Sequence, residues 1–167
     1  SDVCSSDLTA DPEIEVPPTT YGGIERIVDV LVRRLHGAGH QVGLVAKAGS
    51  TCPTDRFFAW PGGRSQSVAD TAINMWTLRQ AVRDFRPDVI HSFSRIAYLL
   101  PHLRGSIPLV MSYQRDPTPR TVGLAARLAA PHVLTFTGCS EYIARCGRPS
   151  GGEWHGIPNF ADTEAGK

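Results

Sequence analysis

Residues 16–46 read VPPTTYGGIERIVDVLVRRLHGAGHQVGLVA, and this stretch decides the fold. A proline-rich loop leads to Gly22 and Gly23, and apolar residues at helical spacing follow from residue 24 to about 36. Two further glycines end this predicted helix, and residues 40–46 then predict a short buried strand. A glycine loop at the positive end of a helix dipole suits a phosphate or another anion. The alternative is that Gly22 and Gly23 only turn the chain into the helix.

Strand-like and helix-like segments continue to alternate after residue 46. The predicted helices cover residues 67–85, 97–104, 121–130 and 140–146, and the predicted strands cover residues 57–60, 89–91, 108–113, 133–137 and 154–158. This alternation predicts an α/β fold, a Rossmann-like doubly wound parallel sheet with helices on both faces. In such a sheet, ligands bind beyond the carboxyl ends of the strands.

The amino-terminal segment SDVCSSDL, residues 1–8, has no useful periodicity. No good strand precedes the glycine loop, so we expect the first strand to be replaced or missing, with this segment in its place. We interpret residues 1–8 as a non-native leader and residues 9–164 as the domain of a longer protein. A central strand of this composition predicts poorly paired neighbours and low stability.

Composition excludes several classes of function. The 167 residues suffice for one domain with a real core, and a net charge of +1 gives no reason to expect a nucleic-acid partner. There is no apolar run of membrane-spanning length and no signal-peptide pattern. The scattered cysteines show no C-x-x-C spacing, which favours reduced thiols, a cytoplasmic location and no zinc site.

Five segments in order resemble the acceptor domain of glycosyltransferase family 4. The glycine-loop stretch at residues 16–46 is similar to the opening of that domain. The other four are RPDVIHSFS, IPLVMSYQRD, FTGCSEYIARCG and IPNFADTE. Together they cover most of residues 16–164.

The resemblance implies one half of a GT-B architecture, with the carboxy-terminal donor-binding domain absent from this chain. It implies a retaining, hexosyltransferase-type enzyme that moves a sugar from a nucleotide-diphosphate sugar to an acceptor hydroxyl, without a cofactor or an essential metal. The acceptor class stays open among glycans, lipids and small molecules. Peripheral membrane association of the full-length enzyme also stays open. We expect this chain alone to be inactive.

The glycine loop carries the clearest match to the family. Gly22 and Gly23 match its glycine pair, whose backbone faces the donor diphosphate and the transferred sugar. Tyr21 and Glu25 match as well. Glu25 is interpreted as a first-turn residue favoured by the helix dipole rather than as a catalytic acid.

Two weak catalytic candidates follow predicted strands. His91 matches the first histidine of the family's D-V-I-H-x-H segment, and Phe93 replaces the second. A histidine at a strand end can equally be a hydrogen-bonded structural residue. Gln114 stands where the family often has a histidine, and an amide cannot carry a proton at neutral pH. In a retaining enzyme the leaving phosphate could accept the acceptor's proton instead.

The remaining binding candidates are Ser92, Arg115 and Ser140. Arg115 could contact an anion or the acceptor, or form a salt bridge with Asp116. Ser140 follows a predicted strand and starts a helix, so N-capping is its expected role. Asn159 resembles the family's turn asparagine.

Two other functions compete with the transferase. One is a non-catalytic Rossmann-like module that binds a nucleotide or a sugar phosphate, although the G-x-G-x-x-G fingerprint is absent. The other is an interaction domain with Phe93, Tyr113 and Trp154 as surface anchors, whereas aromatic residues in such contexts are more often core.

Overall fold

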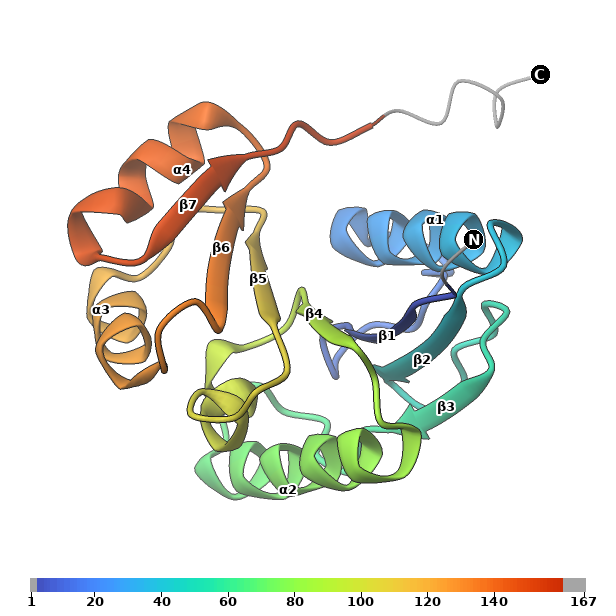
Figure 1. The fold of residues 1–167 in the computed structure, drawn as a ribbon. Coiled ribbons are helices and arrows are strands. Elements are labelled where there is room, and N and C mark those ends of the chain that lie inside the picture. Colours follow the sequence, from blue (N-terminus) through green and yellow to red (C-terminus); the bar gives the residue numbers. More distant parts are fainter. Residues whose placement is uncertain (1–2, 161–167) are drawn as a thin grey trace.

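A single parallel sheet forms the centre of the protein (Figure 1). The structure is a computed structural model, and it describes residues 3–160. Within that range the strand order is β3-β2-β1-β4-β5-β6-β7. The bounds are β1 Ser5–Thr9, β2 Gln41–Ala46, β3 Arg56–Ala59, β4 Val89–Ser92, β5 Leu109–Tyr113, β6 Leu134–Gly138 and β7 Glu153–Gly156. The Rossmann-like parallel sheet predicted from the sequence is confirmed.

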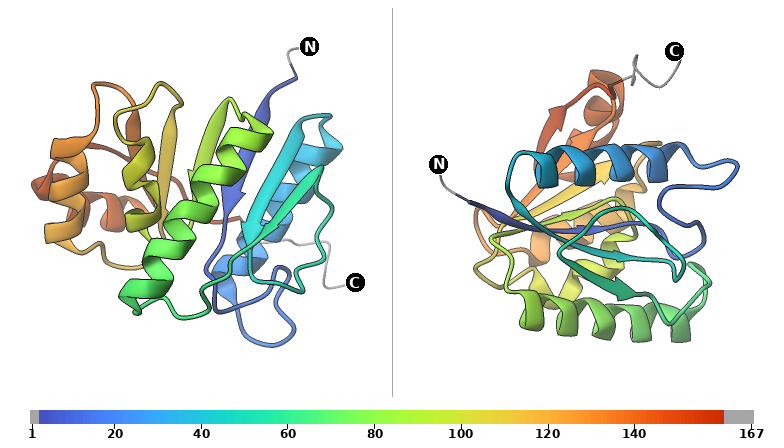
Figure 2. Two further views of the ribbon diagram at one scale, coloured as in Figure 1. Left: turned by 90° about the horizontal axis from the view of Figure 1, so that it is seen from below. Right: turned by 90° about the vertical axis from the view of Figure 1, so that its right-hand side faces the viewer.

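Helices cover both faces of this sheet, as predicted. Figure 1 and the right-hand view of Figure 2 show α1 and α2 on opposite faces. The bounds are α1 Gly23–Gly37, α2 Val68–Phe85, α3 Pro119–Leu128 and α4 Glu141–Gly147, with 3-10 helices η1 Ile96–His102 and η2 Arg148–Ser150. The helix predicted over residues 97–104 is the 3-10 helix η1 and contains Pro101. Proline has no N–H and its ring clashes with the carbonyl four residues before it, so Pro101 interrupts a regular α-helix here.

The first strand is present, so the expectation that it could be missing is wrong, whereas the amino-terminal segment does take its place. Ser5–Thr9 forms β1 in the place predicted for this segment, and it pairs in parallel with β2 on one side and β4 on the other. Ladder hydrogen bonds use only backbone groups, so two well-formed neighbours can hold a strand of low β-propensity. The Asp88 carboxylate adds bonds from the Ser5 N–H at 2.8 Å and the Ser5 hydroxyl at 2.9 Å.

The domain therefore includes residues that the sequence assigned to the leader. The strands beside β1 are paired along its length, contrary to the expectation of poor pairing. The non-native origin of residues 1–8 and the low stability of the chain stay predictions.

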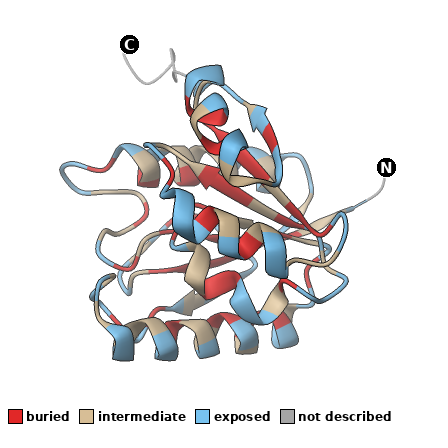
Figure 3. Cartoon of the chain, turned by 90° about the vertical axis from the view of Figure 1, so that its left-hand side faces the viewer, coloured by how far each residue is buried: buried red, intermediate tan, exposed pale blue. Residues whose placement is uncertain are grey.

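The core consists of two clusters, one on each face of the sheet. Leu8 and Leu44 meet Val28 and Val32 of α1 on one face. The other cluster is larger and packs α2, η1 and α3 against the strands. Figure 3 shows buried residues on the sheet and on the inner sides of the helices. β1 contributes Leu8 to the cluster beneath α1 and contributes no residue to the other cluster.

Asp7 is the polar exception in this core. Its side chain is completely buried, and neither carboxylate oxygen has a hydrogen-bond partner within the described structure. Burial raises the pKa of Asp7 from 3.8 to about 7. The side chain lies so close to Gly43 that a Cβ there would approach Asp7 Oδ1 to 2.8 Å.

The helices and the cysteines can be compared with what the composition predicts about membrane spans and thiols. Among residues 3–160, no helix combines the length and hydropathy needed to cross a lipid bilayer. All four cysteines are free thiols.

Candidate functional site

Two adjoining cavities open at the carboxyl edge of the sheet. We call them the larger cavity, about 820 Å³, and the smaller cavity, about 490 Å³. The chain order reverses between β1 and β4, and a crevice at such a switch point is where open α/β sheets bind ligands. The cavities share six lining residues: Asp11, Ile24, Ser65, Gln66, Gln114 and Arg115. They therefore form one continuous site with two compartments.

The glycine loop forms one wall of the larger cavity. Gly22 is the N-cap of α1, where no side chain caps the helix, and Gly23 is its first residue. The N–H groups of the first turn have no helical acceptor, and the dipole makes this end positive. Tyr21 also lines the cavity and is 88% exposed. The glycine pair thus lies at the carboxyl edge of the sheet, where the sequence predicts it, and lines the larger cavity.

Glu25 lines the same cavity from the first turn of α1. Its side chain is almost fully buried, and burial raises its pKa, with a smaller contribution from the charge of Asp11. The carboxylate lies beside Gly22, where a Cβ would approach Glu25 Oε2 to 2.8 Å. Glu25 is thus part of the wall of the larger cavity as well as a first-turn acid.

The loop after β5 separates the two compartments. Gln114 and Arg115 line both cavities. The Gln114 Oε1 atom accepts a hydrogen bond of 2.7 Å from the Asn159 side chain, so its amide N–H groups remain as donors. No ion pair involves Arg115 within residues 3–160, so the predicted alternative of a salt bridge with Asp116 does not occur there.

His91, Ser92 and Ser140 were also predicted at the site, but none of them lines either cavity. Ser140 caps α4 by accepting a bond of 3.3 Å from the Ile143 N–H, as expected. Ser92 is completely buried and accepts a bond of 2.8 Å from the Thr9 hydroxyl. Both serines therefore hold the fold together behind the rim.

His91 reaches the site only through another residue. Its ring stacks on Phe93 with centroids 4.5 Å apart, and its Nε2 atom lies 2.7 Å from the hydroxyl of Ser112, which lines the smaller cavity. Burial lowers the pKa of His91 to about 4, so the ring is neutral at pH 7. This geometry favours the alternative that His91 is a hydrogen-bonded structural residue over the alternative that it contacts a ligand directly.

Several site residues escaped the sequence reasoning. Asp11 and Glu13 follow β1. Because the sequence pattern does not predict β1, it could not place these two residues at the carboxyl edge of the sheet. Asp11 lines both cavities, and its carboxylate accepts a bond of 2.9 Å from the Glu13 N–H. Burial is the main cause that raises the pKa of Asp11, while the charges of Arg95 and Arg115 act in the opposite direction.

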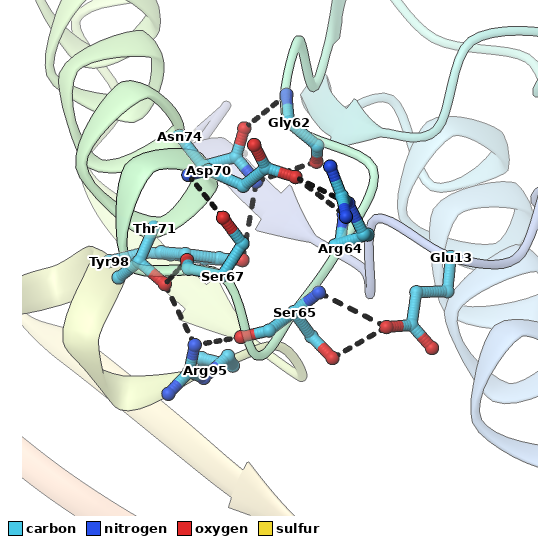
Figure 4. A network of polar contacts seen from close by, with 10 residues as sticks. All are labelled: Glu13, Gly62, Arg64, Ser65, Ser67, Asp70, Thr71, Asn74, Arg95 and Tyr98. Carbon is cyan, nitrogen blue, oxygen red and sulfur yellow. Dashed lines mark hydrogen bonds and ion pairs between the residues drawn. The ribbon is translucent and has the colours of Figure 1, made fainter.

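The loop after β3 is the second part of the site in which no individual residue was identified from the sequence. Ser65 and Gln66 from this loop line both cavities, and Arg64 lines the larger one. Figure 4 shows Ser65 held from two sides. Its N–H and its hydroxyl donate to Glu13 Oε1 at 3.1 and 2.6 Å, and its carbonyl oxygen accepts from the Arg95 guanidinium. Only the turn composition PGG at residues 61–63 marked this loop in the sequence.

The three aromatic residues proposed as surface anchors serve the interior. Phe93 and Trp154 are buried, and Tyr113 is half-buried with its ring 5.5 Å from that of Trp154. Phe93 and Tyr113 contribute to the wall of the smaller cavity. Residues 3–160 also contain no cluster of three or more His, Cys, Asp or Glu side chains suited to hold a metal ion.

Comparison with known proteins agrees with this fold. The family model described as Glycosyltransferase Family 4 matches residues 21–165. A solved glycosyltransferase from Rickettsia africae ESF-5 is similar at 12% identity and a TM-score of 0.59, over 87% of this chain and 39% of that one. AviGT4, a glycosyltransferase involved in avilamycin A biosynthesis, is similar at 16% identity and a TM-score of 0.50, over 97% and 66%.

The chain thus spans less than two thirds of the length of either solved structure. At these identities the likeness shows the fold alone. Comparison with curated protein sequences gives no match.

Proposed function

The chain belongs to glycosyltransferase family 4, and on that premise we propose that it is the acceptor-side half of a retaining glycosyltransferase of hexosyltransferase type. The complete enzyme moves a sugar from a nucleotide-diphosphate sugar to an acceptor hydroxyl. One observation carries the proposal: an uncapped glycine pair at the start of α1 faces an open cavity at the carboxyl edge of the sheet.

The glycine loop supplies electrostatic stabilisation to the departing diphosphate. Negative charge builds on that group as the bond to the sugar breaks, and N–H groups at a helix start can stabilise it without reorganising. Gly22 and Gly23 carry no side chain that would keep the diphosphate at a distance. The first turn of α1 therefore acts on the leaving group, and Tyr21 lies beside it on the rim.

No strong side-chain base lies at the predicted catalytic positions. Gln114 is an amide, and His91 lines neither cavity. In a retaining reaction a phosphate oxygen of the leaving group can accept the proton of the acceptor hydroxyl, so the chain needs no base at position 114. The chemistry then rests on positioning and charge stabilisation, with no step assigned to a metal.

Most of the donor site belongs to the second domain of a GT-B enzyme, so this chain offers half of the cleft. We expect the 167-residue chain to bind a nucleotide diphosphate weakly and to transfer no sugar. A cytoplasmic enzyme with a glycan, lipid or small-molecule acceptor fits this proposal, and peripheral membrane association remains compatible with it.

Binding of nucleotide diphosphates tests the proposal directly. UDP, ADP and GDP are titrated into the labelled 167-residue chain, and backbone amide shifts are followed by NMR. We expect saturable shifts at Gly22, Gly23 and Ile24, and weaker shifts for the matching nucleosides. Shifts confined to residues away from the larger cavity would contradict the proposal.

An activity measurement distinguishes the transferase from the non-catalytic binding module. The non-catalytic binding module predicts the same nucleotide shifts but no transfer by any longer form of the protein. Sugar transfer by a form that carries the second domain, together with none by the 167-residue chain, supports the enzyme. Transfer by the 167-residue chain alone would contradict the half-site argument.

A further inference from the structure

The Glu25 carboxylate lies buried in the wall of the larger cavity, against the glycine loop. The residue is 2% exposed and lines the cavity from the first turn of α1. A Cβ placed on Gly22 would meet Glu25 Oε2 at 2.8 Å, so the acid lies directly beside the backbone of this loop. Any anion that binds at the loop therefore comes close to a buried carboxylate.

Glu25 has no cation as a partner in the part of the chain that the structure describes. All ion pairs of residues 3–160 use other carboxylates. Its own backbone N–H donates to the side chain and lowers its pKa, whereas burial and the charge of Asp11 raise it. Burial has the largest effect, so the site disfavours the ionised form of Glu25 even before a ligand arrives.

The other two acids that line the larger cavity are held by partners of their own. Glu13 Oε1 accepts from the N–H and the hydroxyl of Ser65 at 3.1 and 2.6 Å (Figure 4), which lowers the pKa of Glu13. The Asp11 carboxylate accepts from the Glu13 N–H at 2.9 Å. The charges of Arg95 and Arg115 also favour ionised Asp11. Glu25 is thus the acid of this cavity whose charge is least compensated.

The cations near the start of α1 and across the cavity mostly have partners as well. The Arg115 charge acts on Asp11 and on Glu13, from the loop after β5. The other pairs are Arg26 with the Thr20 carbonyl, Arg33 with Asp29, and Arg64 with Asp70.

A bound diphosphate would oppose the charge of Glu25 directly. Two like charges a few ångströms apart in a poorly hydrated wall repel each other strongly. Protonation of the carboxyl removes this repulsion and converts one of its oxygens from an acceptor into an O–H donor for a phosphate oxygen. The protonated acid therefore joins the N–H groups of the helix start in facing the anion.

We propose that the glycine loop binds a diphosphate together with one proton, and that Glu25 holds this proton. The proton comes from the solvent and returns to it when the diphosphate leaves. The inference rests on the proposed binding of a diphosphate at this loop, and it adds that pH controls this binding.

The direction of the pH dependence follows from linkage. Diphosphate raises the pKa of Glu25 further, so complex formation takes up a proton at any pH between the pKa of the free chain and that of the complex. In this window the affinity falls as the pH rises, by up to about tenfold per pH unit. Below the window Glu25 is protonated in both states, and above it Glu25 is ionised in both, so the affinity is constant there.

The test uses UDP-glucose, ADP-glucose and GDP-mannose, because a diphosphate esterified at both ends does not titrate between pH 5 and 8. Each probe is titrated into the 167-residue chain at pH 5, 6, 7 and 8, and the amides of Gly22 and Gly23 are followed by NMR. We expect the probe that binds to do so about tenfold more tightly at pH 5 than at pH 8. Equal affinity across this range overturns the inference.

Three variants assign the dependence to one side chain. Glu25→Gln keeps the size of the side chain and cannot ionise, so it should bind at pH 8 as tightly as the parent chain does at pH 5. Asp11→Asn should keep the dependence on pH. Glu153→Gln removes an exposed acid outside both cavities and should reproduce the parent profile. A constant affinity in Asp11→Asn, with a parent-like profile in Glu25→Gln, overturns the inference.

The ionisation of Glu25 can also be measured directly in the parent chain. The protein is labelled with ¹³C at the glutamate carboxyl groups and titrated with acid, free and saturated with the probe. The pKa of Glu25 should be higher in the complex. An unchanged or lower value overturns the inference, and this result decides the question even if Glu25→Gln fails to fold.

Failure of this inference and failure of the proposed function give different results. If a nucleotide-diphosphate sugar shifts Gly22 and Gly23 equally well at every pH, the proton linkage fails and the transferase proposal stands. If no such probe shifts these amides at any pH from 5 to 8, the transferase proposal fails, and the inference that rests on it fails as well.

Discussion

Gly22 and Gly23 differ in what a methyl group would meet at each position. A Cβ on Gly22 would lie 2.7 Å from Pro18 Cβ and 2.8 Å from Glu25 Oε2, whereas a Cβ on Gly23 would have no atom within 4 Å. Gly22 is therefore required by close packing, whereas the space beside Gly23 is open and lies at the larger cavity.

Alanine at each glycine should give opposite results. Gly23→Ala should leave stability unchanged within about 0.5 kcal/mol and weaken nucleotide-diphosphate binding by about tenfold, because its methyl group occupies the larger cavity. Gly22→Ala should cost about 1–3 kcal/mol through the clash with Pro18 and Glu25. Urea denaturation and NMR titration measure the two quantities. Equal nucleotide affinity in Gly23→Ala and the parent chain would show that this surface is not a diphosphate site.

Asp7 is a residue whose replacement should stabilise the protein. A pKa of about 7 in place of 3.8 corresponds to about 4 kcal/mol of unfavourable free energy once the carboxyl is ionised. Asp7→Val removes that cost and suits a buried strand, so the free energy of unfolding at pH 8 should rise by several kcal/mol. Thermal and urea unfolding of both chains at pH 8 measure the gain. A variant no more stable than the parent would show that Asp7 has partners in solution.

At the scale of an element, α2 ends unfavourably. Its C-cap residue, Arg86, adopts the left-handed conformation with φ 52°. Residues with a Cβ reach this region at a cost of about 1–2 kcal/mol, and glycine does so freely. The helix thus ends at a position that favours glycine.

Two arginine-to-glycine substitutions, one at the C-cap and one inside α2, test this capping argument. Arg86→Gly should raise the free energy of unfolding by about 1 kcal/mol, since it relieves the left-handed residue. Arg83→Gly places glycine inside the exposed face of the same helix and should lower it by about 1 kcal/mol. Urea midpoints at constant slope measure both. The same sign of change in the two variants would contradict the capping argument.

Element prediction succeeded where the signal is local and failed where it is not. The helix over residues 24–36 and the strand over residues 40–46 show their periodicity and their glycine boundaries in the sequence, and the structure places α1 and β2 there. β1 has no such signal, because SSDLT contains one large apolar residue. Its neighbours β2 and β4, far along the chain, supply the hydrogen bonds that make it a strand.

At the scale of the whole molecule, two buried groups oppose each other in their pH dependence. Asp7 has its pKa raised to about 7, so it takes up a proton on folding when the pH lies between 3.8 and 7. His91 has its pKa lowered to about 4, so it releases a proton on folding between 4 and 6.5. Asp7 makes stability fall as the pH rises, and His91 makes it rise. The two slopes cancel between about pH 4 and 6.5.

We therefore expect Asp7 and His91 together to contribute almost no net slope to the stability of the parent chain in that range. Asp7→Asn keeps the size of the side chain and removes its titration, so the stability of this variant should rise with pH by up to about 1.4 kcal/mol per pH unit between 4 and 6.5. Above about pH 8 the slopes of the two profiles should be equal, because neither Asp7 nor His91 titrates there. Urea unfolding at half-unit pH steps measures them. Parallel profiles for the two chains would show that Asp7 does not titrate in this range.

Only part of the candidate site could be predicted from the sequence. The glycine loop and the loop after β5 could be placed on the rim, because each follows or precedes an element with clear periodicity. Asp11, Ser65 and Arg95 could not be placed. Asp11 depended on an unrecognised strand, and the other two depended on contacts with distant loops, which no local pattern records.

The sequence by itself determined the order of the elements, the parallel α/β class and the position of Gly22 and Gly23 at a helix start. These follow from periodicity and from glycine conformation, which act over a few neighbouring residues. Only the tertiary structure decided that residues 5–9 form a strand between β2 and β4, and that His91 Nε2 contacts the Ser112 hydroxyl instead of either cavity. Those outcomes depend on the register of parallel strands, which brings together residues that are distant along the chain.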